Sequence, residues 1–430
     1  MLKSALSTGA AILMLAAASS SFAVAQPTDA PDDALLEREA RVDAILRLAL
    51  ARNPDLAEEQ QRVAAAQARA RQASRLPDPQ LKYEQWGVSL RRPFALDEAD
   101  TLMLGLSQNF PAPGTLDARA QAGNEQVANA AASQDTRRRN LRAQVRRAFA
   151  DYYRADRELR LHREHVELTA RLVELARASY RSGQRGQQDV LRLGLELSRL
   201  HRDLAHLEQE QRSARALLNA LMNRSVEAPL GPPVEIEPLK DAPPADEAAA
   251  QTQRPEVRAA HAAVRGSEAG LDLARREARW PSFMVGLDYM YMPFMESRHN
   301  YGAMVSINLP WLTPGRKDSI KAAEATLAAD RHALESVRNT IRYQIRDAVA
   351  RFEAARSTFT IVETDLMPQA QRTFESVQSG YSAGQGDALA LIDALRSFLD
   401  VRLDRVRALV HLETAAADLE RALGQKEKTP

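Results

Sequence analysis

The sequence Phe110-Pro111-Ala112-Pro113-Gly114 has a counterpart about 201 residues later in this chain. The counterpart is Leu309-Pro310-Trp311-Leu312-Thr313-Pro314-Gly315. The same offset relates Tyr180-Arg181-Ser182-Gly183-Gln184 to Tyr381-Ser382-Ala383-Gly384-Gln385, and Asn53-Pro54-Asp55 to Arg254-Pro255-Glu256. Three landmarks that keep nearly one offset indicate an internal duplication rather than chance similarity of low-complexity sequence. We therefore expect two copies of one structural unit, each reading helix, strand, strand and long helix hairpin.

Two extended segments precede each of the two Pro–Gly sequences, residues 110–114 and 309–315, which we call the Pro–Gly exits. We expect strands at about residues 81–90 and 101–110, and again at 282–291 and 301–309. Leu102, Leu104 and Leu106 alternate with other residues, which is the pattern of a strand with one apolar face. A length of about ten residues suits a tilted strand that crosses a membrane. Half of the aromatic residues, with all three tryptophans, lie in residues 80–111 and 280–312, as in the aromatic belts of membrane proteins.

Long helices follow each exit, because apolar residues recur at steps of four and three, the heptad pattern of coiled coils. We expect them at about residues 115–182 and 187–222, and again at 316–380 and 387–423. The first of these would be roughly 100 Å long at a rise of about 1.5 Å per residue. That length suits a structure that spans a compartment better than one that encloses a globular core. Pro368 is expected to kink the third helix.

The ends of the chain and its middle have distinct compositions. Residues 1–25 combine Lys3, a short apolar run and Ala23-Val24-Ala25, which are the parts of a secretory signal peptide. The apolar run is too short to span a bilayer, and no later run is longer, so membrane insertion would have to use strands. The expected boundaries are residues 26–227 for the first copy, 228–253 for an extended proline-rich linker, 254–424 for the second copy and 425–430 for a tail.

The totals exclude several classes of protein. The 430 residues include 58 Lys and Arg and 57 Asp and Glu, so the chain lacks the excess positive charge that attracts nucleic acid. The chain has no cysteine and therefore neither a disulfide nor a lipid-attachment cysteine. It carries no phosphate-binding loop, nucleophile elbow or metalloprotease motif, so we expect neither an enzyme nor a cofactor.

The strand count predicts an oligomer. Lipid tolerates no open sheet edge, and about eight strands are needed before a barrel closes with its interior filled by side chains. Four strands per chain cannot do this, so several copies must contribute to one barrel. The expected fold is thus mostly α with a membrane β-barrel contribution, in which the long helices continue the barrel wall as a tube.

With these features the sequence resembles the outer-membrane factor family, the TolC-type channel proteins. The resemblance covers nearly the whole mature chain, and its most specific part is Tyr381-Ser382-Ala383-Gly384 followed by Asp393-Ala394. Leu76-Pro77-Asp78-Pro79 and residues 109–114 are nearer to the branch that serves heavy-metal pumps. The resemblance implies a homotrimer with a twelve-strand barrel and a periplasmic helical tunnel, in the outer membrane of a Gram-negative bacterium. It also implies a passive exit duct that docks onto a periplasmic adaptor and an inner-membrane pump, which in the heavy-metal branch is of the RND type.

The resemblance further implies a gate where polar links join the helix tips. Asp189 matches an acidic link position, and Tyr381 matches its tyrosine partner. Gly386 stands where the family member compared has an arginine, so one link is either missing or replaced by Arg185.

Acidic residues should line the tunnel entrance in this family. Asp393 matches one of two entrance aspartates, whereas Ala390 stands at the other, with Asp387 as a candidate substitute. We hypothesise that Asp393 of each chain contributes to a ring that attracts cations. Helix capping explains Asp189 and Asp387 equally well, because carboxylates favour helix N-termini.

Four glycines should form the tips. Gly183, Gly186, Gly384 and Gly386 are expected in tight turns, where their exposed backbone and Arg185 would contact the adaptor. Turn formation alone would explain the glycines as well.

Two further clusters invite a metal-binding interpretation. Thioethers bind Cu(I), and five methionines fall in one hairpin: Met284, Met290, Met292, Met295 and Met304. We favour the simpler interpretation that they face lipid or lie in a loop. His162 and His165 are three residues apart, but His162 lies on a heptad stripe and no further ligand accompanies the pair, so no metal site is expected.

Two alternative functions remain open on the sequence. An exported soluble coiled-coil scaffold could use the strand hairpins as dimerisation arms. The same channel fold could also serve type I protein secretion.

Overall fold

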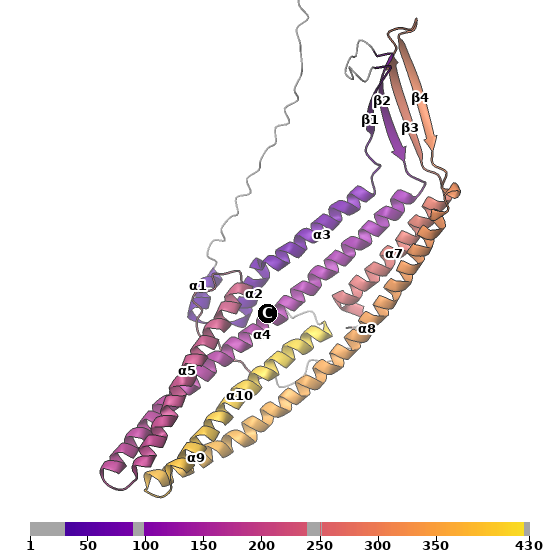
Figure 1. Cartoon of the computed structure of the whole chain (residues 1–430). Coiled ribbons are helices and arrows are strands. Elements are labelled where there is room, and N and C mark those ends of the chain that lie inside the picture. Colours follow the sequence, from indigo (N-terminus) through magenta and orange to yellow (C-terminus); the bar gives the residue numbers. More distant parts are fainter. Residues whose placement is uncertain (1–30, 89–98, 239–249, 251, 425–430) are drawn as a thin grey trace, which may run out of the picture.

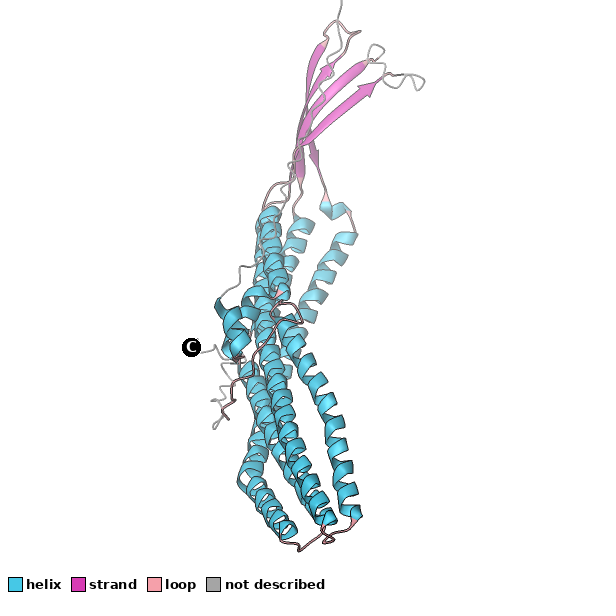
Figure 2. Ribbon diagram, turned by 90° about the vertical axis from the view of Figure 1, so that its left-hand side faces the viewer, coloured by secondary structure: helices cyan, strands magenta, loops and turns pink. Residues whose placement is uncertain are grey.

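The protein is an elongated molecule with a sheet at one end and two helix hairpin tips at the other (Figure 1). The computed structural model describes residues 31–88, 99–238, 250 and 252–424. The expected signal peptide and C-terminal tail lie outside these residues. Figure 2 shows the same shape from the side, with the strands leading away from the ends of the helices.

The two copies contain matching elements. Those of the first copy are α1 (Pro31–Arg38), α2 (Val42–Arg52), α3 (Pro54–Ala73), β1 (Gln80–Trp86), β2 (Thr101–Phe110), α4 (Thr115–Arg181) and α5 (Gln187–Leu221). Those of the second copy are α7 (Pro255–Arg279), β3 (Phe283–Tyr291), β4 (His299–Ile307), α8 (Gly315–Ile361), α9 (Met367–Ser382) and α10 (Ala388–Leu423). A 3₁₀ turn at Pro310–Leu312 joins β4 to α8.

The third long helix is not continuous, which corrects the expectation of one helix over residues 316–380. A π-helical turn at Val362–Leu366 separates α8 from α9. Its cause is Pro368, which has no N–H to donate and whose ring collides with the carbonyl four residues earlier in a regular helix. A widened turn just before the proline relieves that collision. The matching helix of the first copy, α4, runs for 67 residues without interruption.

The four strands form one antiparallel sheet in the order β1-β2-β3-β4, so the two copies meet at the β2–β3 pair. β1 is shorter than the strand expected at residues 81–90, and part of that range lies in residues 89–98, which the structure does not describe. The register gives the sheet two unlike faces. Leu106 pairs with Leu287 on one face, and Gly105 pairs with Asp288 on the other.

Apolar stripes hold the helices together. Around the middle of the molecule α2, α4, α5 and α10 share one buried cluster that includes Ile45, Tyr153 and Leu218. A second cluster joins α7, α8 and α10 around Phe352, and a third lies near the hairpin tips. Among the described residues, no helix is both long and apolar enough to span a membrane.

The described part of the expected linker packs against the N-terminal helices. Ala40 forms a parallel β-bridge with Pro233, and its N–H donates to the Pro232 carbonyl over 2.9 Å. The Gly231 N–H donates to the Leu36 carbonyl over 2.8 Å. The extended backbone after α5 is thus fixed beside α1 and α2.

Candidate functional site

The two hairpin tips lie side by side at the end of the molecule opposite the sheet (Figures 1 and 2). One tip joins α4 to α5 and the other joins α9 to α10. Next to the tips, on the side toward the sheet, α4, α5, α9 and α10 share an apolar core, in which the Phe374 and Phe398 rings stack at 5.3 Å. This core brings residues about 200 positions apart in the sequence into one site.

Each Tyr-x-x-Gly turn forms because glycine ends a helix in the left-handed conformation. Gly183 has φ 74° and Gly384 has φ 83°, a region that disfavours residues with a Cβ. In the first tip the Gly183 N–H donates to the Tyr180 carbonyl and the Gln184 N–H to the Ser179 carbonyl, each over 3.0 Å. This is the Schellman arrangement, and the second tip repeats it around Gly384. The motif thus has a structural cause in both copies.

Arg185 joins the two tips. Its guanidinium donates to the carbonyl oxygens of Tyr381 and Gly386, each over 2.8 Å. The same group lies 3.9 Å from the centre of the Tyr381 ring, within the range of a cation–π interaction. A planar guanidinium can satisfy several acceptors at once, which lysine cannot do in this geometry. The side chain suggested as a replacement link therefore makes the polar contacts between the tips.

Tyr381 contributes its ring and its backbone, and not its hydroxyl. Its side chain is buried, with 3% of the residue exposed, and the hydroxyl has no hydrogen-bond partner among the described residues. Burial raises the pKa of Tyr381, so the phenol stays neutral. Within one chain, therefore, the Tyr381 hydroxyl makes no hydrogen bond to Asp189. Arg185 lies between them, with Nη1 3.5 Å from Oδ2 of Asp189.

The three aspartates occupy different environments. Asp189 lies in the first turn of α5 and is 6% exposed, so the helix N-terminus and Arg185 both offset its charge. Asp387 is the N-cap of α10, and its Oδ1 accepts from the Ala390 N–H over 2.8 Å. Asp393 is exposed on the following turn of α10. Helix capping thus accounts for Asp387, whereas Asp393 has no such role.

The exposed glycines of the tips are open to approach. A Cβ built on Gly183, Gly384 or Gly386 would meet no atom within 4 Å, and Gly186 would meet only the neighbouring Gln188 side chain. Bare backbone therefore faces outward at the end of the molecule.

One tip residue escaped the sequence analysis. Glu196 is 5% exposed and accepts two hydrogen bonds from Arg396 of α10, one of them over 2.8 Å from Nε. It lies seven residues after Asp189, on the same face of α5. The sequence did carry a signal for Glu196: it lies one heptad, about two helical turns, after the expected link residue Asp189 and close to the buried Leu193.

A second polar feature lies deeper in the helices. His165 is 1% exposed, neither ring nitrogen has a hydrogen-bond partner, and its ring packs against Phe398 of α10 at 6.0 Å. Burial, with the nearby charge of Arg402, lowers the pKa of His165 to about 4. His162 differs, because its Nδ1 lies 3.1 Å from the Glu158 carbonyl oxygen. Within the described residues no group of three or more His, Asp and Glu side chains is placed to hold a metal ion.

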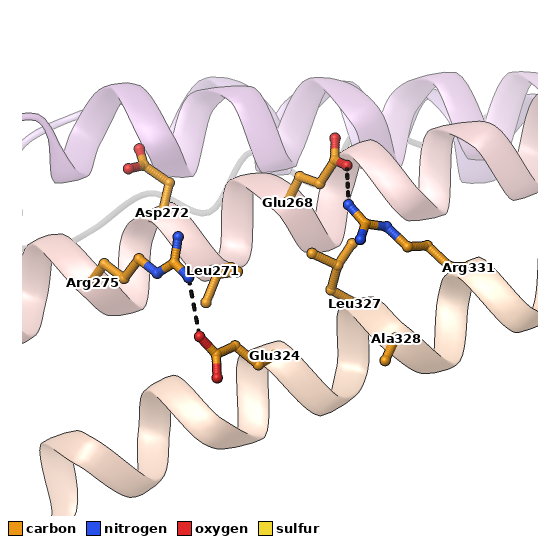
Figure 3. A pocket seen from close by; sticks show the side chains of 8 residues that line it. All are labelled: Glu268, Leu271, Asp272, Arg275, Glu324, Leu327, Ala328 and Arg331. Atoms are coloured by element: carbon orange, nitrogen blue, oxygen red, sulfur yellow. Dashed lines mark hydrogen bonds and ion pairs between the residues drawn. The ribbon is translucent and has the colours of Figure 1, made fainter.

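A groove of about 510 Å³ lies between α7 and α8, far from the tips. Figure 3 shows its apolar floor at Leu271 and Leu327 and two ion pairs across it. Arg275 pairs with Glu324 at 3.0 Å, and Arg331 pairs with Glu268 at 3.1 Å. Because these charges neutralise one another, we interpret the groove as part of the packing between α7 and α8 and not as a binding site. The tips remain the candidate site.

The fold defines the class of protein. It superposes on the CusC channel structure with a TM-score of 0.77 at 19% identity, covering 89% of this chain and 91% of CusC. The open state of the MtrE outer membrane channel of Neisseria gonorrhoeae gives a TM-score of 0.76 at 21% identity, covering 89% of both chains. The expectation of a TolC-type fold, mostly α with a four-stranded sheet, is confirmed.

The sequence then defines the family. Residues 45–224 and 248–425 match the Outer membrane efflux protein family, and the chain belongs to it. It is also 23% identical over 424 residues to the cobalt-zinc-cadmium resistance protein CzcC of Cupriavidus metallidurans, covering 96% of this chain and 98% of CzcC. The protein is an outer-membrane efflux channel of the kind that works in tripartite systems, as the resemblance implied. Members of the family form trimers and work with an adaptor and an inner-membrane pump.

Proposed function

We propose that this chain forms a homotrimeric exit duct for heavy-metal cations, supplied by a periplasmic adaptor and an RND-type inner-membrane pump. The observation that carries the substrate class is the alignment with a cobalt-zinc-cadmium resistance protein over 96% of this chain. An alignment of that extent includes the sheet, the helices and both tips, and so supports a shared role for the whole chain.

The sheet supports the trimer. β1 and β4 are its edges, and each leaves a row of backbone groups unpaired in the protomer. One face carries exposed apolar side chains, namely Leu81, Tyr83, Leu104, Leu106, Leu287 and Val305. Pairing β4 of one chain with β1 of the next would close a twelve-stranded barrel in three chains, with the apolar face toward lipid. The opposite, polar face would then line the pore.

The tips support the docking surface and the gate. Outward backbone at Gly183, Gly186, Gly384 and Gly386 would accept the adaptor, while Arg185 holds the two hairpins of one chain together. Docking that displaces Arg185 from its two carbonyl acceptors would separate the tips and widen the entrance.

Asp393 supports cation selectivity at that entrance, because it is exposed near the tip in each of three chains. We expect Asp393→Ala to lower the preference for cations in single-channel recordings and to weaken block by divalent cations. Glu375→Ala is the matched control, since it removes an exposed carboxylate from the other helix of the same hairpin. Unchanged selectivity and unchanged block in Asp393→Ala would refute the ring.

Deletion of the gene tests the substrate. We expect a deletion strain to become sensitive to cobalt, zinc and cadmium, and the full-length chain to restore resistance. Wild-type resistance together with loss of a secreted protein would instead support type I secretion. Extraction of the protein from membranes without detergent would support the soluble scaffold, which the family assignment already disfavours.

A further inference from the structure

All four methionines within the strands lie on the polar face of the sheet. They are Met103 in β2, Met284 and Met290 in β3, and Met304 in β4. Met103 pairs with Met290, Met284 with Asn109, and Met304 with Gly286. Directly paired residues point to the same side of a sheet, and alternate residues along a strand do so too. The methionines therefore share a face with Gly105, Ser107 and Asp288.

If the apolar face of the sheet meets lipid, as proposed above, the register places these methionines on the opposite face. The apolar face is made of other pairs, such as Leu106 with Leu287 and Phe110 with Phe283. No described strand methionine lies among them. Met295 does fit the loop interpretation, because it lies in the turn between β3 and β4 and is 62% exposed. A water-facing cluster of apolar side chains calls for another explanation.

Glycines make room for polarizable and acidic groups at the centre of this face. The Asp288 carboxylate lies over Gly105, with Oδ1 only 2.1 Å from where a Cβ would be. The Met290 methyl lies 3.3 Å from the corresponding point on Gly302, and the Met304 methyl 3.4 Å from that on Gly286. Any side chain at Gly105 would displace the carboxylate.

Met103, Met290 and Asp288 occupy neighbouring positions on this face of β2 and β3. Met103 and Met290 are direct cross-strand partners, and Asp288 is two residues from Met290 on the same strand. Cross-strand partners have Cβ atoms about 5 Å apart, and diagonal neighbours remain within reach of long side chains. A change of rotamer that turns Met290 from Gly302 toward Met103 would bring two thioethers and the Asp288 carboxylate to a single ion.

We propose that Met103, Met290 and Asp288 form a weak binding site for a soft monovalent cation, Cu(I) or Ag(I), on the pore side of the sheet. Thioether sulfur selects soft cations, while the carboxylate supplies the opposite charge. Met304 and Met284 extend the thioether surface along the same face, and the trimer presents it three times. Weak binding at several positions suits conduction, since an ion must enter a site and also leave it. The pore placement rests on the proposed function, whereas the ligand set rests on the register alone.

The first test measures binding and does not depend on conduction. The full-length protein, purified in detergent and in nitrate buffer to keep silver soluble, is equilibrated with Ag(I) by dialysis. We expect the double variant Met103→Leu/Met290→Leu to bind Ag(I) about tenfold more weakly or worse. Met295→Leu is the matched control and should bind as the wild type does. Leucine conserves the volume of methionine, so the sheet should persist. Equal affinity in the double variant would overturn the proposal.

The second test places the site in the pore. In planar bilayers, Ag(I) should block the potassium nitrate current of the wild type and block that of the double variant less. Zinc block should be the same in both proteins, because Zn²⁺ prefers harder ligands. Methionine-dependent binding without methionine-dependent block would overturn the pore-side placement. Absence of potassium current in both the wild type and Arg185→Ala would count against the proposed duct, and the dialysis result would still decide the ligand set.

Discussion

The two hairpin tips of this chain have the same turn and opposite roles. At the duplicated positions, Tyr180 is 46% exposed and Tyr381 is 3% exposed. Arg185 of the first tip corresponds to Gly386 of the second, and the Gly386 carbonyl accepts from Arg185 over 2.8 Å. Asp189 corresponds to Ala390. The first tip therefore supplies the charged side chains, and the second supplies the ring and the carbonyl oxygens that receive them.

Duplication thus accounts for the shared turn, and divergence of the two copies accounts for the contact between the tips. Two identical arginine tips would repel each other, whereas an arginine tip and a carbonyl-rich tip attract. The same divergence appears farther along the helices. His165 is buried in the uninterrupted α4, while its counterpart in the second copy, Leu366, ends the π-helical turn.

The largest expected effect concerns His165 and acid. Burial lowers the pKa of His165 in the folded state to about 4, below the ordinary histidine value of 6.5, so the folded state binds protons less readily than the unfolded state. Stability should be constant above about pH 6.5, fall as the pH drops toward 4, and level off below that. The loss is about 3 kcal/mol per protomer, from about 1.4 kcal/mol per pKa unit. The groups facing the ring are Arg402, His162 and Glu164.

Urea unfolding of the detergent-solubilised protein as a function of pH measures this loss. We expect His165→Leu to remove most of the acid dependence, because the leucine cannot take up a proton. Replacing the exposed His201 by glutamine should leave it as in the wild type. An unaltered acid profile in His165→Leu would assign the sensitivity to other groups.

The next effect concerns the link between the tips. Arg185→Ala removes two hydrogen bonds and a cation–π contact, and should weaken the tip-to-tip contact by about 2 kcal/mol. Hydrogen exchange should therefore speed up at the turn over residues 383–388. Arg185→Lys should restore little of the protection from exchange, since an ammonium group lacks the planar guanidinium geometry that reaches both carbonyl oxygens. Arg181→Ala serves as the control, because within the described residues Arg181 donates to the Arg177 carbonyl of its own helix and makes no hydrogen bond or ion pair with the other tip.

The smallest effect compares two ion pairs. Arg396→Ala deprives the buried Glu196 of its bidentate partner across the tips, although Arg199 remains 3.6 Å away. We expect a loss of about 1 kcal/mol in the free energy of unfolding. Arg177→Ala breaks an exposed pair with Glu174 inside α4 and should cost no more than about 0.5 kcal/mol. Equal losses of unfolding free energy in the two variants would mean that an ion pair between the copies stabilises the protein no more than one inside a single helix.

Much of the fold could be predicted because its signals are local and repeated. The heptad stripes, the Pro–Gly exits and the single offset predicted the fold class, which is confirmed. The π-helical turn could not be predicted, because Pro368 indicates that the helix is distorted but does not say whether the distortion is a kink, a break or a π-helical turn. Arg185 was only a candidate link, because its acceptors are backbone carbonyl oxygens that any residue would provide. The methionine face required the β2–β3 register, which depends on pairing between strands of different copies, such as Phe110 with Phe283, and not on either strand alone.

Single-channel conductance of Arg185→Ala tests the central claim most directly. The claim is that one arginine of the first copy, bound to two carbonyl oxygens of the second, holds the periplasmic end closed. The full-length trimer in a planar bilayer should conduct several-fold more in Arg185→Ala than in the wild type, with Arg181→Ala unchanged. A conductance of Arg185→Ala equal to that of the wild type would contradict the account.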